Sequence, residues 1–253
     1  MLQEYQITPN FWCAEEYFDK AGLEEIHDGN WVYIWDPEAK VTVLPPINVN
    51  FGVGPLREKQ DWAKKFWSDF INYYPGASYQ SKFLDLEYTY DPKDFLEMKG
   101  GKWSTFRKNC RKFPERNQGQ QLYIQPGLEH EKPILNVIKD WIGHREPHEL
   151  EVLVSYATNG QNRRVLLGDD GQIFGINAWD DNWDRINYRL CICKSGSYFL
   201  SEYLHLLFYT DSAIIDQGKL VNDGGILDNP MLQIFKEKLN PILVRKVQSW
   251  RRK

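Results

Sequence analysis

The chain has 253 residues, of which 42% are hydrophobic and 26% charged, and its formal net charge is -4. This composition excludes a disordered chain, and no apolar run approaches the roughly 18 residues that a membrane-spanning helix needs. Met1–Asn10 lacks a basic start followed by an apolar stretch, so we expect no secretory leader. The four cysteines form no CxxC pair. We therefore expect a reduced, cytoplasmic protein without a metal site.

Basic residues are concentrated in two segments of this acidic chain. Lys99–Arg116 holds seven Lys and Arg residues against one Glu, and Arg245–Lys253 holds five bases and no acid. Such a distribution predicts that a polyanion binds at specific places and not over the whole surface.

The first half of the chain shows short elements separated by proline and glycine. Trp31–Trp35 and Val41–Leu44 are predicted to be a strand pair. The spacing of the aromatic residues predicts a helix over Arg57–Tyr73. Phe83–Tyr90 is predicted to be a strand, and Asp91-Pro92 starts a short helix that ends at Met98.

The second half has a clearer order, β-α-α-β-β-β-α-β-α-β. Turn residues separate the three central strands, which indicates a meander. The expected elements are a strand at Gln121–Gln125, helices at Pro133–Ile142 and Glu149–Ala157, meander strands at Arg163–Leu167, Ile173–Trp179 and Arg185–Cys193, a helix at Ser197–Thr210, a strand at Leu220–Asn222, a helix from Pro230 to Asn240-Pro241 and a strand at Ile242–Val247.

This order resembles the GNAT acyltransferase fold, and two motifs narrow the resemblance. The run Tyr90–Gly100, followed by Lys102 and Arg107-Lys108-Asn109, is similar to the C-terminal domain family of phosphatidylglycerol lysyltransferases, which are relatives of the Fem aminoacyltransferases. The ending resembles that family too, through Val221–Gly225, Leu232, Lys236 and Asn240-Pro241.

The resemblance implies an α+β protein of two GNAT-like halves, the second complete and the first degraded. The expected divisions are 1–98 for the degraded half, 99–118 for a basic helical segment and 119–253 for the catalytic half. It implies transfer of an acyl or aminoacyl group from acyl-CoA or aminoacyl-tRNA to an amine or hydroxyl, without a metal. Two alternatives stay open: a nucleic-acid-binding protein on an inactive GNAT scaffold, and a soluble lipid aminoacyltransferase.

A donor site is expected after the third meander strand. Acetyl-CoA binders carry a glycine-rich loop there, whereas this chain has a single glycine, which keeps aminoacyl-tRNA beside acyl-CoA as a donor. A helix amino end, two serines and a lysine favour an anion; the other interpretation is a plain turn capped by Ser197. The candidate donor-binding residues are Lys194, Ser195, Gly196, Ser197, Tyr198 and, on the last helix, Lys236.

Candidate catalytic residues are Asn222, Asp223 and Tyr188. Asp223 would take a proton from the acceptor if its pKa were raised towards neutrality, and the alternative is an Asn-Asp-Gly-Gly turn. No Ser-His-Asp or Cys-His pattern is legible, so we expect direct transfer without a covalent enzyme intermediate. We also expect a pocket where the last meander strand separates from its neighbour, with the Gly196 loop and Asp223 facing each other across it.

The segment around Lys99–Arg116 has helical periodicity. Trp103, Phe106, Cys110 and Phe113 would fall on a narrow packed face. The candidate phosphate-binding residues cover a separate arc: Lys102, Arg107, Lys108, Arg111 and Lys112. This favours nucleic acid over a lipid headgroup as the polyanion. The basic tail from Arg245 is expected to be a frayed end, or else an extension of the same surface.

Overall fold

The computed structural model describes residues 21–28, 31–37, 41–42, 47–48, 52–53, 62–67, 79–117, 123–126, 131–143, 147–159, 162–182, 184–226 and 228–252. The described strands form one mixed sheet in the order β5-β4-β2-β3-β6-β13-β7-β12-β11-β10-β9-β8, with β1 beside β2. The class is therefore α+β, as predicted.

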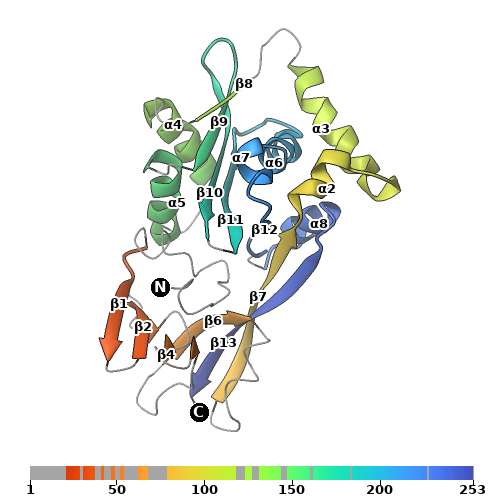
Figure 1. Cartoon of the computed structure of the whole chain (residues 1–253). Coiled ribbons are helices and arrows are strands. Elements are labelled where there is room, and N and C mark those ends of the chain that lie inside the picture. Colours follow the sequence, from red (N-terminus) through yellow and green to blue (C-terminus); the bar gives the residue numbers. More distant parts are fainter. Residues whose placement is uncertain are drawn as a thin grey trace.

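Strands dominate the described part of the first half. They are β1 (Glu24–Asp28), β2 (Trp31–Asp36), β3 (Val41–Thr42), β4 (Ile47–Asn48), β5 (Gly52–Val53), β6 (Trp62–Trp67) and β7 (Tyr79–Tyr90). The long β7 pairs with β13, the last strand of the chain, and connects the strands of the first half to those of the second half (Figure 1).

The second half contains the complete GNAT-like order, with one extra short helix, α7. Its elements are β8 (Tyr123–Pro126), α4 (Glu131–Ile142), α5 (Pro147–Asn159), β9 (Arg163–Leu167), β10 (Ile173–Asp181), β11 (Arg185–Cys193), α6 (Leu200–Tyr209), α7 (Ser212–Ile215), β12 (Leu220–Asn222), α8 (Pro230–Lys238) and β13 (Leu243–Arg252). Strands β9, β11 and β12 have the predicted bounds, because alternating apolar runs and hairpin turns mark them locally.

Helices cover both faces of the meander (Figure 1). Val165 and Leu167 pack in the cluster that α4 and α5 complete, whereas Leu166 between them packs against α6. This alternation follows from the two-residue period of a strand. On the α6 face, Gly175 is required because a Cβ there would lie 2.3 Å from a methyl carbon of Leu204.

The basic segment forms a helix whose packed face is the predicted one. After α2 (Pro92–Glu97) and a 3-10 turn (Gly101–Trp103), α3 covers Ser104–Arg116. Each residue of the predicted packed face is at most 3% exposed: Trp103, Phe106, Cys110 and Phe113. This packed face of α3 lies in the core, and the charged side chains lie on the rest of the helix surface.

Two expectations for the first half and the tail are wrong. Trp62–Trp67, inside the predicted helix Arg57–Tyr73, is a strand that pairs antiparallel with β13. Aromatic residues four apart fit a helix, but pairing with a distant strand overrides local propensity; the rest of that range lies outside the described residues. The basic tail is not frayed, since β13 continues to Arg252 between β6 and β7.

A bulge in β11 determines which side chains share a face. Leu190 pairs with Ala178, but the next pair joins Tyr188 to Trp179, which leaves Arg189 as the extra residue. Tyr188 therefore faces α6, where its ring stacks on Phe208 at 3.9 Å. Arg189 turns to the other face and pairs with Asp180, so the prediction that Tyr188 and Arg189 point to opposite faces is confirmed.

Candidate functional site

Strands β11 and β12 separate soon after they meet. They pair in parallel over three residues only, the last pair being Asn187 with Asn222. Beyond Asn222 the chain follows β7 instead, because the Asp223 amide donates to the Tyr88 carbonyl at 2.9 Å and the Tyr88 amide donates to the Gly224 carbonyl at 3.2 Å. The last meander strand and its neighbour therefore separate at the place where the sequence predicts a pocket, and the pocket itself stays a prediction.

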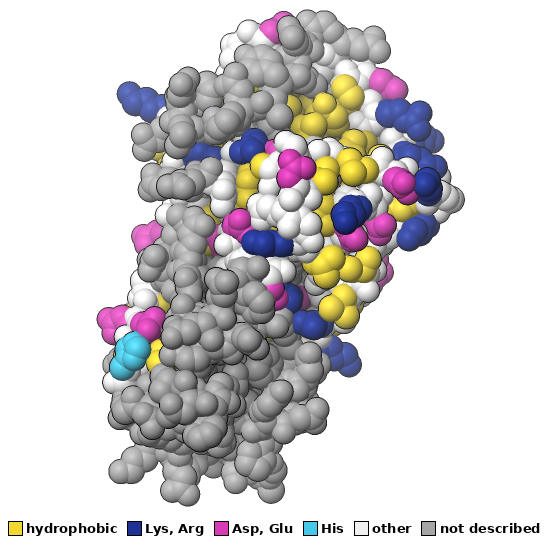
Figure 2. Space-filling model, viewed as in Figure 1, with side chains coloured by type: hydrophobic (Ala, Val, Ile, Leu, Met, Phe, Trp, Pro, Cys, Tyr) yellow, Lys and Arg dark blue, Asp and Glu magenta, His cyan; other side chains and the backbone are white. Residues whose placement is uncertain are grey.

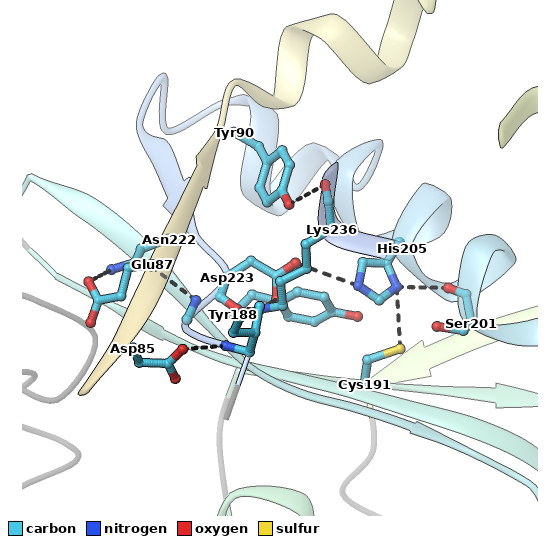
Figure 3. Close-up of polar contacts among 12 residues, drawn as sticks. Asp85, Glu87, Tyr90, Tyr188, Cys191, Ser201, His205, Asn222, Asp223 and Lys236 are labelled. Atoms are coloured by element: carbon cyan, nitrogen blue, oxygen red, sulfur yellow. Dashed lines mark hydrogen bonds and ion pairs between the residues drawn. The ribbon is translucent and has the colours of Figure 1, made fainter. Parts of the chain in front are cut away.

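Charged side chains from three elements meet at this point (Figure 3). Asp223 follows β12, His205 comes from α6 and Lys236 comes from α8. The Asp223 Oδ2 atom lies 3.6 Å from His205 Nε2, and Asp223 Oδ1 lies 3.4 Å from Lys236 Nζ, which also donates to the Asp223 carbonyl. All three side chains are buried. A buried carboxylate is thus held between two cationic groups.

The pKa values in this cluster move in opposite directions. Burial raises the pKa of Asp223, but Lys236 and His205 outweigh it, and the net pKa lies below the ordinary value. Burial lowers the pKa of His205, but the negative charges of Cys191 and Asp223 raise it to about 10. These shifts favour a carboxylate at Asp223 and an imidazolium at His205 at neutral pH, and they make Asp223 a poor base.

Cys191 of β11 completes a Cys-His-Asp arrangement. Its Sγ atom lies 3.5 Å from His205 Nδ1, and the same nitrogen lies 2.7 Å from the carbonyl oxygen of Ser201. Because a carbonyl only accepts, Nδ1 carries a proton and donates it to the Ser201 carbonyl, with the Cys191 sulfur beside this N–H group. A hydrogen bond from Cys193 lowers the pKa of Cys191 most; burial opposes this and His205 reinforces it, leaving the pKa well below its usual value.

The sequence did not reveal Cys191 and His205 as site residues. They are separated by a strand end, a loop and a turn of helix, and each has an ordinary neighbourhood in the chain. The bulge at Arg189 is also invisible in the sequence, and it places Cys191 on the same face as Tyr188. The signal that could have found them is the resemblance to a fold in which the third meander strand and the next helix line the reaction centre.

The other two predicted catalytic residues hold the cluster in place. Asn222 is fully buried; its amide nitrogen donates to Glu87 at 3.0 Å and its oxygen accepts from the Gly224 amide at 3.0 Å. The Tyr188 hydroxyl donates to Asn177 Oδ1 at 2.5 Å, and its ring lies edge-on to His205 with centroids 5.2 Å apart. Burial is the main reason that the pKa of Tyr188 lies well above its usual value.

The predicted donor loop lies at the surface. Ser195, Gly196 and Tyr198 are exposed, and α6 begins at Leu200, three residues later than expected. The residue before the helix, Phe199, adopts a positive φ of 64°, which costs energy for a side chain of this size. The Ser195 amide donates to a carboxylate oxygen of Asp140 at 3.3 Å, so this loop already holds one anionic group.

The end of α3 meets this loop. Lys112 Nζ lies 4.2 Å from the centre of the Phe199 ring, and the Arg116 guanidinium lies 4.9 Å from the same ring and 5.7 Å from that of Tyr198. Lys and Arg side chains gather over α3 in Figure 2. The structure therefore joins the predicted donor loop to the last turns of the basic helix.

The remaining basic residues of α3 differ in their surroundings. Lys102, Lys108 and Arg111 are exposed. Arg107 instead donates to the carbonyl oxygens of Met98 and Gly100, which fixes the turn between α2 and α3. Met98 has a positive φ of 41°, so this turn requires such support.

The donor loop and Asp223 do not face each other across a short gap, which corrects our expectation. Asn222 pairs with Asn187 near the start of β11, whereas the loop follows Cys193 at its other end. At about 3.3 Å per residue, the five steps on β10 that span Asn187 to Cys193 cover roughly 17 Å. The side chains grouped around Asp223 are those of His205, Tyr188 and Lys236. A ligand that used both places would have to extend along β11.

Two further properties concern the described residues alone. No helix in the described ranges is long and apolar enough to cross a membrane. The same ranges contain no group of three or more His, Cys, Asp and Glu side chains arranged to hold a metal ion.

The separated strands, the flanking helices and the element order define a GNAT-like fold. Comparison with solved structures finds proteins that share this fold. L-PGS from Bacillus licheniformis superposes with a TM-score of 0.66 at 16% identity, covering 98% of this chain and 91% of that one. The C-terminal domain of a protein assigned as a lysylphosphatidylglycerol synthetase from Agrobacterium fabrum gives 0.62 at 12% identity, covering 91% and 84%.

A protein of unknown function from Bacteroides thetaiotaomicron is also similar, with a TM-score of 0.73 at 14% identity over 96% of this chain and 92% of that one. No family model matches the chain, and no curated protein matches it. At these identities the likeness establishes the fold alone.

Proposed function

We propose that this protein transfers an acyl or aminoacyl group from an activated, phosphate-bearing donor to an amine or hydroxyl. The observation that carries the proposal is the buried cluster of His205, Asp223 and Lys236 where β11 and β12 separate. An imidazolium at this place can polarise the donor carbonyl and protonate the leaving oxygen or sulfur. The Asp223 carboxylate keeps His205 charged and oriented, and the ammonium group of Lys236 balances the negative charge of Asp223.

The donor's phosphates are proposed to bind between α3 and the loop before α6. Lys112 and Arg116 lie over the rings of Phe199 and Tyr198, and Lys194 is half-buried in the same loop. The exposed charges of Lys102, Lys108 and Arg111 extend this surface along α3. Its distance from Asp223 requires a long donor, and both a CoA thioester and the end of an aminoacyl-tRNA satisfy that requirement.

Aminoacyl-tRNA is the donor we favour. The loop has a single glycine, Gly196, and its Ser195 amide is engaged by Asp140, so it offers few amides for a pyrophosphate. The basic face of α3 suits a nucleic-acid backbone. The lysylphosphatidylglycerol synthetase domain of the same fold is named for an aminoacylated lipid, which makes phosphatidylglycerol the first acceptor to test.

The test measures donor consumption with each donor class in turn. Purified protein is incubated with a mixture of radiolabelled aminoacyl-tRNAs or with acetyl-CoA, together with phosphatidylglycerol vesicles, polyamines or peptides as acceptors. We expect transfer of label from aminoacyl-tRNA to one acceptor class, and a loss of at least about 100-fold in His205→Gln. If both donors stay intact, or if His205→Gln is as active as the wild type, the proposal fails. Binding of tRNA without any transfer would favour the inactive nucleic-acid-binding scaffold.

A further inference from the structure

We propose that Cys191 is a nucleophile that carries the acyl group as a thioester between donor and acceptor. This inference rests on the proposed transferase activity and deepens it. It starts from the arrangement in Figure 3, where His205 lies between the sulfur of Cys191 and the carboxylate of Asp223. A thiol, an imidazole and a carboxylate in this order are the constellation of cysteine-dependent acyl transfer.

Both nitrogens of His205 are accounted for. Nδ1 faces the Ser201 carbonyl at 2.7 Å and the Cys191 sulfur at 3.5 Å, and Nε2 faces Asp223 at 3.6 Å. Two acceptors on one side and a carboxylate on the other favour the doubly protonated ring. An imidazolium beside sulfur stabilises the thiolate, which is the nucleophilic form of cysteine.

The surroundings of the three side chains hold them rigidly. The His205 ring contacts Tyr188 edge-on at 5.2 Å and Phe235 at 4.9 Å between centroids. Asp223 Oδ2 is buried and lies 3.6 Å from Nε2, so its negative charge faces that nitrogen. The residue Cys191 is half-buried, whereas His205 is 4% exposed.

The reaction balances in two steps. The Cys191 thiolate attacks the donor carbonyl carbon, a C–S bond forms, the bond to the donor oxygen or sulfur breaks, and the leaving group takes the proton of His205. The acceptor amine or hydroxyl then attacks the thioester, the C–S bond breaks, and the acceptor's proton returns to His205. Cys191 is a thiolate again, and no oxidant, reductant or metal is consumed.

The first experiment traps the thioester with p-nitrophenyl acetate, a generic activated acetyl ester that needs no donor site. Full-length protein is mixed with the ester, quenched in acid, digested and analysed by mass spectrometry. We expect acetyl on the Cys191 peptide, released by neutral hydroxylamine, together with a stoichiometric burst of p-nitrophenolate. Cys191→Ser and His205→Gln should lose the burst by at least tenfold. Cys110→Ser is the matched control, because a hydroxyl there still donates to the Glu202 carbonyl that the Cys110 sulfur contacts at 3.3 Å.

A second measurement uses the unaltered protein, so it holds even if a variant fails to fold. Alkylation by iodoacetamide is followed at each cysteine between pH 5 and 9. We expect the alkylation rate of Cys191 to level off at a lower pH than that of an ordinary thiol, and to be at least about tenfold faster at pH 6 than that of Cys193, two residues along the same strand.

The inference is overturned if Cys191 stays unacetylated, or if its alkylation rises only above pH 8 as for an ordinary thiol. If labelled donor is transferred normally by Cys191→Ser, the covalent step is wrong while the transferase function stands. If acetyl-Cys191 forms but neither aminoacyl-tRNA nor acetyl-CoA is consumed, Cys191 is a nucleophile and the proposed donors are wrong.

Discussion

His205 and Asp223 are paired across the point where the sheet divides, with 3.6 Å between Nε2 and Oδ2. One residue belongs to the helix that packs on β11, and the other belongs to the segment that leaves β11 for β7. Their contact therefore links α6 to the segment that follows β12.

Replacing His205 with Gln is expected to reduce transfer by at least about 100-fold, with little change in the KM of the donor. Gln keeps a hydrogen-bonding group but supplies no proton, so the loss falls on kcat. Steady-state kinetics with the labelled donor would show this. A rise in KM at constant kcat would instead assign His205 to donor binding.

The stability of the protein should depend on pH through the same residue. The pKa of His205 is raised to about 10 in the folded state, against about 6.5 in an unfolded chain. Its contribution is therefore complete below about pH 6.5 and is lost as the pH rises through 10. Among the described residues, the titratable groups that face it are Cys191, Asp223, Tyr188 and Tyr209, with Lys236 beside Asp223. Urea unfolding at pH 7 and pH 10.5 should show a loss that His205→Gln does not share; equal losses would contradict this.

Lys236→Met is expected to lower the free energy of unfolding by about 3 kcal/mol, because it removes one partner of a buried ion pair. The Lys236 ammonium lies 3.4 Å from Asp223 Oδ1 and is only 5% exposed. The matched control is Lys132→Met on α4, whose side chain is exposed. Urea denaturation checks both variants, and a Lys236→Met protein as stable as the control would show that Asp223 does not need this cation.

Gly225→Ala should destabilise the fold by about 1–3 kcal/mol through overpacking. A Cβ at Gly225 would lie 1.9 Å from Asp85 Oδ2, and Asp85 Oδ1 accepts from the Ile226 amide at 2.9 Å. The change therefore disturbs the segment that carries Asp223. Thermal unfolding should show a clear decrease in Tm, whereas Gly101→Ala, where a Cβ meets nothing within 4 Å, should not.

The double substitution Lys112→Ala and Arg116→Ala is expected to raise the KM of the donor about tenfold and to leave kcat unchanged. The salt dependence of donor binding should become shallower by about two phosphate contacts, because each cation that meets a phosphate displaces a counterion. Lys246→Ala on β13 is the control, since its side chain is exposed on the other part of the molecule. If the salt dependence of donor binding is unchanged, the donor's phosphates do not contact this surface.

The sequence by itself determined the class, the order of the second half and several boundaries. Strands β9, β11 and β12 and the packed face of α3 depend on local patterns: alternation, turn residues and apolar spacing. Asp223, Lys236 and Tyr188 are also candidates from the sequence, and the structure brings Asp223 and Tyr188 beside His205 and Lys236 beside Asp223. The predicted divisions at 98 and 118 and the roles of these residues stay predictions.

Only the tertiary structure decided that Cys191 and His205 belong to this cluster. Strict alternation would place Tyr188 and Cys191 on opposite faces of β11, since they are three residues apart. The bulge at Arg189, set by pairing with β10, turns both towards α6. Likewise, pairing with β13 makes Trp62–Trp67 a strand despite its helical spacing. In both cases a hydrogen-bonded partner distant in sequence determines the backbone, and local periodicity carries no information about that partner.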